Sequence, residues 1–190
     1  MEQKTRTVSP FSNESRNAYV VEHLTGSMLA LLEEKPLADI SISELCGRAG
    51  VGRTSFYRNY EDKEGIVKAY IQRLFQDWVD RCKASPDLSV RETVRMVFSH
   101  FEANRDFYSL LNKRGLVYLL KDVILDLCGF DPEQELAAAY ASAYVGFFLY
   151  GWIEGWFRRG MRDTAEELIA YLPQMKKQGR FPIGKRPCLT

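Results

Sequence analysis

Four hydrogen-bonding side chains fall on one side of a short segment when it is drawn as an α-helix: Arg53, Thr54, Tyr57 and Arg58. They supply two guanidinium groups, a hydroxyl and a phenol, which can bond to base edges and phosphate oxygens. Phe56 and Tyr60 fall on another side and can pack against a core. The major groove of B-DNA admits an α-helix, and arginine can bond bidentately to guanine there. The spacing therefore predicts a helix that rests on a core and presents donors to DNA.

The residues before this helix carry the signals that would position it. Apolar residues recur with helical spacing over residues 14–34, which predicts a packing helix. Ser41 and Glu44 then form a capping-box pattern that starts a short helix. Gly50 suits the left-handed position that ends such a helix, and the reading helix follows over residues 53–60. Two short helices joined by a tight turn, after a packing helix, are typical of a helix-turn-helix.

Further donors stand where backbone phosphates would lie. Ser43 belongs to the first turn of the first short helix, where free N–H groups attract anions. Asn59 and Lys63 flank the end of the reading helix. The predicted DNA contacts are Arg53 and Thr54 at base edges, Tyr57 and Lys63 at phosphates, Arg58 in either role, and Ser43, Ser55 and Asn59 in support.

Residues 17–64 resemble the N-terminal DNA-binding domain of the TetR family of bacterial transcription regulators, most clearly over ISISELCGRAGVGRTSFYRNYEDKEGI. The family pattern is a hydroxyl-rich start, an alanine-glycine-valine turn, a small/hydroxyl pair, an aromatic pair, a further aromatic and a lysine-acid pair. This chain carries it as Ser41/Ser43, Ala49-Gly50-Val51, Thr54-Ser55, Phe56-Tyr57, Tyr60 and Lys63-Glu64. Asn59 stands where many members have histidine, and it can still donate to a phosphate.

The resemblance implies an Ω-shaped homodimer in which the first three helices read DNA and the fourth links them to a regulatory domain. Residues 65–178 resemble the family less sharply, so no ligand residue is carried over. Sequence-specific DNA binding also favours a dimer of the chain, because two recognition helices about 34 Å apart recognise a palindrome. The expected partners are a palindromic double-stranded operator, a second copy of the chain and a small-molecule effector that relieves repression.

Helical periodicity recurs through the rest of the chain, and no segment alternates as a strand would. The sequence therefore predicts an all-α fold of about nine helices. Asp131-Pro132-Glu133 is typical of a helix start. The later helices are predicted at 89–102, 104–113, 116–128, 132–160 and 163–178. The predicted domains are a flexible arm at 1–13, the DNA-binding domain at 14–63, a ligand-binding and dimerisation domain at 64–178, and a basic tail at 179–190.

Aromatic residues crowd residues 140–157 and surround their helix, which predicts burial on most of its sides. One side would pack in the chain's own core, and the other, with residues 163–178, would meet a two-fold mate. A buried helix explains the uncharged run Leu136 to Ile153 better than a membrane span does. The rings serve either as core and interface or as the wall of an effector pocket. The candidate pocket residues are His100, Asn104, Tyr108, Tyr118, Tyr144 and Trp152.

The composition limits the other functions that the chain could have. A net charge of +1 argues against coating nucleic acid through bulk charge but allows a small, specific surface. The cysteines are scattered singly, and the histidines lack catalytic or metal-binding spacing. We therefore expect no catalytic residues, metal or cofactor, and a cytoplasmic location without a secretory signal. Two alternatives stay open, a helical interaction protein that does not bind DNA and an all-α enzyme acting in the aromatic cavity.

Overall fold

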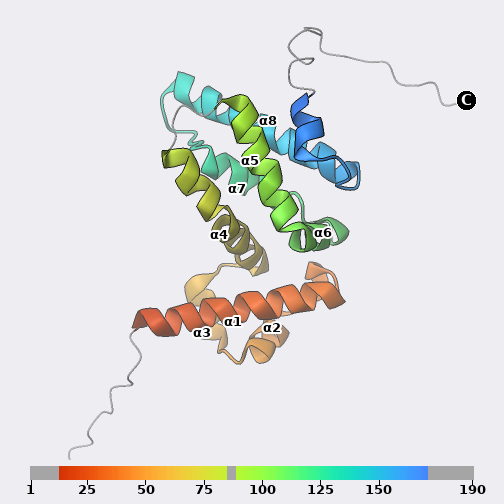
Figure 1. Cartoon of the computed structure of the whole chain (residues 1–190). Coiled ribbons are helices and arrows are strands. Elements are labelled where there is room, and N and C mark those ends of the chain that lie inside the picture. Colours follow the sequence, from red (N-terminus) through yellow and green to blue (C-terminus); the bar gives the residue numbers. More distant parts are fainter. Residues whose placement is uncertain (1–12, 85–88, 171–190) are drawn as a thin grey trace, which may run out of the picture. The chain divides into compact units, whose positions relative to one another are not determined.

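The computed structural model describes residues 13–84 and 89–170, and every regular element in these ranges is a helix (Figure 1). This confirms the predicted all-α class. The elements are α1 (Asn13–Glu34), the 3-10 helix η1 (Leu37–Asp39), α2 (Ile42–Ala49), α3 (Arg53–Asn59), α4 (Lys63–Ala84), α5 (Val90–Ala103), α6 (Arg105–Lys113), α7 (Leu119–Leu127) and α8 (Leu136–Arg158). Residues 165–170 form the described part of the helix predicted at 163–178. The predicted arm, apart from Asn13, and the basic tail lie outside the described residues.

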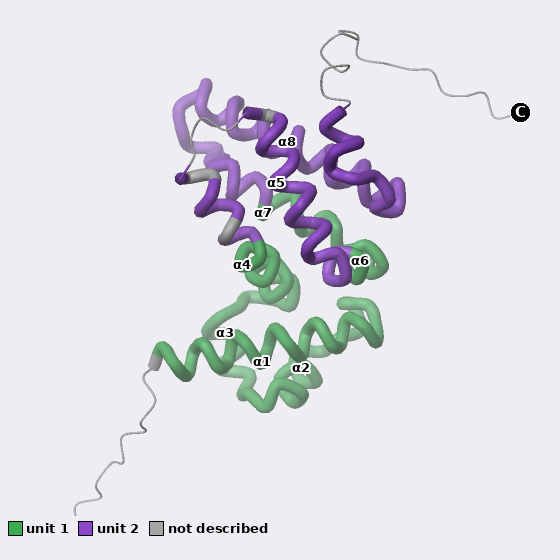
Figure 2. The backbone as a smooth tube through the Cα atoms, in the orientation of Figure 1, with its two compact units in different colours: residues 1–74, 109–123 green, residues 75–108, 124–190 purple. Residues whose placement is uncertain are grey.

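The chain forms two compact units that do not follow one another in sequence (Figure 2). Unit 1 takes residues up to Leu74 together with Ser109–Val123, so α1, α2 and α3 share a unit with the start of α4 and the α6–α7 connection. Unit 2 takes Phe75–Tyr108 and the residues from Ile124 onward.

Polar contacts to the ends of helices hold the α6–α7 connection in unit 1. The guanidinium of Arg114 donates from Nη2 to the carbonyl of Glu33 at 2.6 Å, and its Nε donates to the carbonyl of Leu32. These carbonyls belong to the last turn of α1, where intrahelical partners run out. Two contacts join this part of the chain to α4: Tyr118 Oη of the connection donates to Glu64 at 2.6 Å, and Lys68 Nζ donates to Asp122 of α7 at 3.0 Å.

The core of unit 2 is largely aromatic. Phe98, Phe101, Tyr108 and Trp156 are all fully buried, and the rings of Phe101 and Tyr108 lie 4.3 Å apart. The indole N–H of Trp156 donates to the carbonyl of Asp163 at 2.7 Å. This contact ties the end of α8 to the chain that follows it.

The predicted start of α8 is wrong. Asp131 accepts a hydrogen bond from the N–H of Glu133 at 2.9 Å, which closes a local turn around Pro132. The helix begins only at Leu136, with the carboxylate of Glu135 accepting from the N–H of Ala138. Aspartate before proline initiates a turn here rather than the first turn of a helix.

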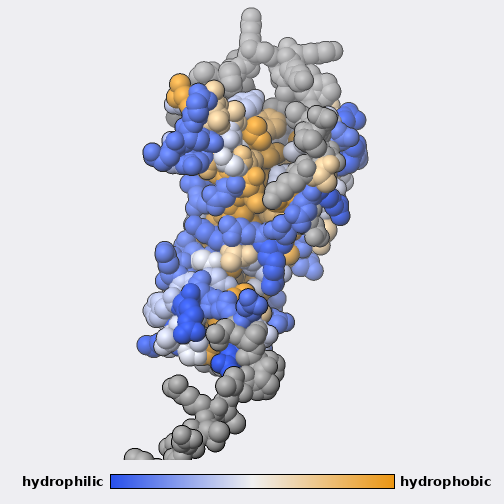
Figure 3. All heavy atoms as spheres, turned by 90° about the vertical axis from the view of Figure 1, so that its left-hand side faces the viewer, coloured by the Kyte–Doolittle hydropathy of each residue, from blue (hydrophilic) through white to orange (hydrophobic). Residues whose placement is uncertain are grey.

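In a single chain, α8 is buried in its second half and open in its first. Leu136, Tyr140 and Tyr144 are each more than 70% exposed, whereas Ile153 and Trp156 are buried. By length and composition, α8 is the helix among the described residues that is apolar enough to cross a membrane. Apolar residues are open to view on unit 2 in Figure 3. The aromatic helix was expected to be buried on most of its sides. In a single copy of the chain, the first half of α8 is exposed instead.

Candidate nucleic-acid interface

Local capping signals build the turn between α2 and α3. The hydroxyl of Ser41 accepts from the N–H of Glu44 at 3.1 Å and caps α2. Gly50 has a φ of 66°, and the N–H of Val51 donates back to the carbonyl of Cys46 at 3.0 Å. This is the left-handed helix end that glycine favours. α3 then starts at once, with Gly52 as its N-cap.

A salt bridge fixes the start of α2 to the end of α1. Lys35 Nζ donates to both carboxylate oxygens of Glu44, at 2.6 and 2.8 Å. The hydrogen bond from Lys35 is the main reason that the pKa of Glu44 is lowered. The carboxylate is exposed, so this pair orients α2 more than it stabilises the fold.

The apolar face of α3 is docked. Phe56 is fully buried, with Leu45 of α2 and Leu24 of α1 also fully buried. α1 contacts α2 and α3, and these two contact each other. Tyr60 follows at the end of α3, and its burial raises the pKa of its phenol. The predicted docking face is thus the face that α3 turns inward.

The opposite face of α3 is open to solvent. All four of its predicted donors are exposed, with Tyr57 the most informative because 59% of a large aromatic side chain is exposed there. Ser55 and Asn59 are half-buried, and Asn59 donates from its side-chain amide to the carbonyl of Ser55 at 2.9 Å. One side-chain N–H of Asn59 is therefore already hydrogen-bonded within its own helix.

Two predicted contacts from different helices meet in the structure. Arg53 Nη2 donates to the hydroxyl of Ser43, which brings the start of α3 to the first turn of α2. Both side chains are exposed. The arginine is thereby held along the outer surface of the helix-turn-helix.

Lys63 has a structural role that its sequence position did not indicate. Its ammonium donates to the carbonyls of Leu37 at 2.7 Å and Ile40 at 2.5 Å, with Ala38 at 3.5 Å. The lysine therefore joins the first turn of α4 to the η1 turn. No local pattern could have shown this contact, because its acceptors are backbone atoms more than 20 residues earlier.

Replacing Lys63 with methionine is expected to lower the free energy of unfolding by about 1–2 kcal/mol, because half-buried carbonyls lose their donor. Urea denaturation followed by circular dichroism measures this change. Lys121→Met is the matched control, since Lys121 makes a surface ion pair with Asp122 at 3.6 Å. Equal losses in the two variants would contradict the structural role of Lys63.

The candidate pocket residues do not form one site. His100, Asn104 and Tyr108 come together in unit 2, where His100 Nε2 lies 2.6 Å from Tyr108 Oη. Asn104 donates to the carbonyl of His100 at 2.9 Å. Trp152 packs beside Phe148 with ring centroids 5.5 Å apart.

The two remaining candidate pocket residues lie elsewhere. Tyr118 belongs to unit 1, where burial and its hydrogen bond to Glu64 raise the pKa of its phenol to about 12. Tyr144 lies on α8 with 73% of its side chain exposed. Among the six candidates, the structure therefore shows direct contacts within one group of three, His100, Asn104 and Tyr108.

Comparison with known proteins gives a family match to the helix-turn-helix region of the chain. Residues 29–70, from the second half of α1 into α4, match the family of bacterial regulatory proteins called the tetR family. An uncharacterized HTH-type transcriptional regulator of Bacillus subtilis, YxbF, is 26% identical over 184 residues, covering 88% of this chain and 46% of that protein. The HTH-type transcriptional regulator EthR of Mycolicibacterium smegmatis is 31% identical over 78 residues, covering 37% of this chain and 36% of EthR. The chain therefore spans less than half the length of these curated relatives.

A solved structure extends the likeness to the whole fold. The crystal structure of Lin0861 from Listeria innocua superposes with a TM-score of 0.68, covering 90% of this chain and 97% of that one, at 14% identity. At that identity the likeness concerns the fold alone. The match to the tetR family of bacterial regulatory proteins spans residues 29–70 and so coincides with the helix-turn-helix of unit 1.

Proposed function

We propose that the protein is a sequence-specific DNA-binding transcription regulator and not an enzyme. The observation that carries the proposal is the division of α3, which buries Phe56 and exposes four hydrogen-bonding side chains. A docked helix with an exposed polar face has the size and chemistry that the major groove accepts. Residues 14–63 would form the DNA-binding domain, and residues 64–178 the dimerisation and effector domain.

The expected contacts divide by position on the helices. Arg53 and Thr54 lie in the first turn of α3 and would contact base edges. Tyr57 and Arg58 lie in its second turn, closer to the backbone phosphates. Ser43 would hold Arg53 along the groove or contact a phosphate at the start of α2. The occupied ammonium of Lys63 contributes by fixing the start of α4.

We further propose that the protein acts as a homodimer joined through α8. Four of the five exposed large apolar residues of α8 are spaced by four, four and three positions, so that they line one face of the helix: Leu136, Tyr140, Tyr144 and Phe147. The fifth, Val145, lies on another face. A contiguous exposed apolar face marks an interface. A second copy of the chain fits best, since a two-fold axis also pairs the reading helices for a palindromic operator.

The alternative occupant of this face is a lipid bilayer, because α8 is long and apolar enough to span one. The second half of the same helix argues against it. Leu149, Ile153 and Trp156 are buried in unit 2 and would have to leave their core to face lipid. We therefore place the protein in the cytoplasm, bound to its operator and released from it by a small-molecule effector.

Replacing Arg53 with alanine tests the proposed function. Selection from random-sequence DNA is expected to return a palindrome with the wild-type protein and a less defined motif with the variant. If Arg53 reads a guanine, about 1–3 kcal/mol of discrimination is lost in each half-site. Arg48→Ala is the matched control, because Arg48 is an exposed arginine of α2 paired with Glu34. Identical motifs from wild type and Arg53→Ala would refute base reading by Arg53, and no enriched motif from wild type would refute the function itself.

A further inference from the structure

The exposed face of α8 changes character halfway along the helix. Its first half carries a ridge of large apolar side chains: Leu136, Tyr140, Tyr144 and Phe147. Two further steps of four residues along the same face lead to Gly151 and then to Gly155. At about 100° per residue, all six positions lie within about 100° of arc around the helix. One helix face therefore presents a ridge, followed by two positions without side chains.

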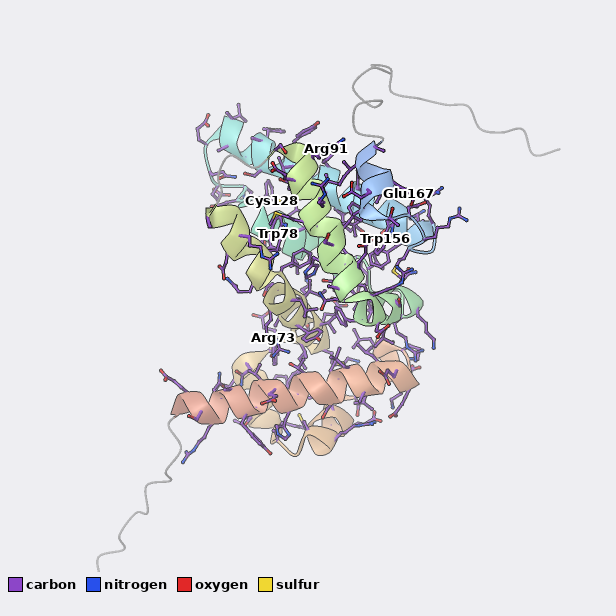
Figure 4. The ribbon with its side chains drawn as sticks, in the orientation of Figure 1. Arg73, Trp78, Arg91, Cys128, Trp156 and Glu167 are labelled. Carbon is purple, nitrogen blue, oxygen red and sulfur yellow. The ribbon has the colours of Figure 1, made fainter. Side chains whose placement is uncertain are left out.

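A groove of about 540 Å³ lies at these two glycines, and we call it the glycine groove. Its other lining residues come from the second half of α8 and from the turn and helix that follow: Trp152, Trp156, Arg159, Asp163, Glu167 and Leu168. Figure 4 labels Trp156 of α8 and Glu167 of the helix that follows. Cavities of about 300–1,000 Å³ accommodate drug-sized molecules, so the glycine groove has room for aromatic side chains.

The packing of a single copy does not explain the two glycines. A Cβ atom on Gly151 or Gly155 would meet no heavy atom of the described residues within 4 Å, apart from neighbours on the same helix. Gly146 of α8 differs, because a Cβ atom there would come within 2.7 Å of the side chain of Leu125. Glycine inside a helix is less stable than alanine. Gly151 and Gly155 therefore destabilise α8 without allowing a close contact inside the copy.

We propose that the ridge of one copy enters the glycine groove of a second copy, in an antiparallel pair of α8 helices whose two-fold axis passes close to Phe147. Tyr144 of one copy then lies over Gly151 of the other, and Tyr140 lies over Gly155, because both pairs are centred on the same point of the helix. A two-fold axis repeats every contact, so each groove receives the other copy's ridge. This inference rests on the proposed homodimer and specifies how its two copies face each other.

Charge favours the antiparallel direction. The residues that lead into α8 are acidic, and Glu133 and Glu135 are exposed there. At the other end, Arg158 pairs with Glu154 yet keeps 79% of its side chain exposed, and Arg162 is exposed after the helix. Antiparallel pairing brings the acidic start of each copy toward the arginines of the other, whereas parallel pairing would bring the two acidic starts together. Complementary charges of this kind determine the register of an interface.

Paired cysteines test the register in the full chain. Tyr140→Cys combined with Gly155→Cys is expected to form a disulfide between copies under mild oxidation, and peptide mapping by mass spectrometry identifies the bonded positions. The two cysteines cannot bond within one helix, because they lie about 22 Å apart along it and a disulfide requires Cα atoms within about 7 Å. Tyr140→Cys alone is the matched control, and it should form no bond between the two copies of position 140.

Gly151→Leu tests the glycine groove itself. In a single copy the added side chain enters open space, so the circular dichroism spectrum should be unchanged. The dissociation constant of the dimer, measured by sedimentation, should rise at least about tenfold, because leucine occupies the space assigned to Tyr144 of the second copy. Gly26→Leu is the matched control, since Gly26 is an exposed glycine of α1 with equally open surroundings. It should leave the dimer unchanged.

These results separate the register from the proposed function. A monomeric wild-type protein would refute the homodimer and the register with it. A dimer that forms no bond between positions 140 and 155, or that bonds position 140 to itself, would overturn the register and leave the homodimer standing. An unchanged dissociation constant in Gly151→Leu would also overturn it, and would assign the glycine groove to another occupant, such as residues 171–190 of the same chain.

Discussion

Replacing Tyr144 with glutamate is expected to convert the dimer to monomers and to lower the affinity for a palindromic operator by at least about a hundredfold. Tyr144 lies near the middle of the open face of α8 and is 73% exposed in a single chain. In an interface between identical copies, both carboxylates would enter the same apolar contact without a partner. Linked half-sites bind as one unit, and about two to four orders of magnitude of affinity depend on that link.

Sedimentation velocity measures the first effect and fluorescence anisotropy with a labelled palindrome measures the second. Tyr144→Phe is the control, since it keeps the apolar ring and should keep the dimer. A Tyr144→Glu protein that stays dimeric would place the interface elsewhere than on α8. A monomeric variant with wild-type operator affinity would show instead that pairing is not needed for DNA binding.

The helix-turn-helix could be predicted because its signals are local. A serine cap at Ser41 and a left-handed glycine at Gly50 act within one turn of the chain, and both have the predicted roles. The inward position of Phe56 follows from helical spacing alone. Local hydrogen bonding also explains the error at α8, where Asp131 uses its side chain to close a turn that sequence patterns cannot tell from a helix start.

The candidate pocket could not be predicted in the same way. Aromatic residues on helices are equally suited to a core, an interface or a pocket, and spacing does not say which helix each one meets. Tyr118 shows this, because the connection that carries it belongs with α1 and α4 in unit 1. That placement depends on Arg114 reaching backbone carbonyls about 80 residues earlier, a contact without a sequence signal.

The two tryptophans Trp78 and Trp156 illustrate a second limit of sequence reasoning. The indole N–H of Trp78 is buried without a hydrogen-bond partner among the described residues, whereas that of Trp156 donates to the carbonyl of Asp163. Residue type and helical spacing are the same for a tryptophan with an acceptor and for one without, so the sequence does not distinguish them.

Replacing Phe56 with alanine is expected to destabilise unit 1 by about 3–5 kcal/mol, because it removes a fully buried aromatic ring. α3 has seven residues, too few for an isolated helix to persist in water, so its order depends on this docking contact. The variant should lose operator binding together with stability. Urea denaturation gives the free energy of unfolding, and anisotropy gives the operator affinity.

Tyr57 provides the matched comparison because it is the next residue and its ring lies 5.1 Å from that of Phe56, yet it is mostly exposed. Tyr57→Ala should change the free energy of unfolding by less than about 0.5 kcal/mol. It should weaken binding to all DNA sequences alike, by about 1 kcal/mol for each lost phosphate contact. A Tyr57→Ala protein with wild-type DNA affinity would show that the exposed face of α3 does not contact DNA. A stable Phe56→Ala protein would show that docking of this ring does not hold the face in place.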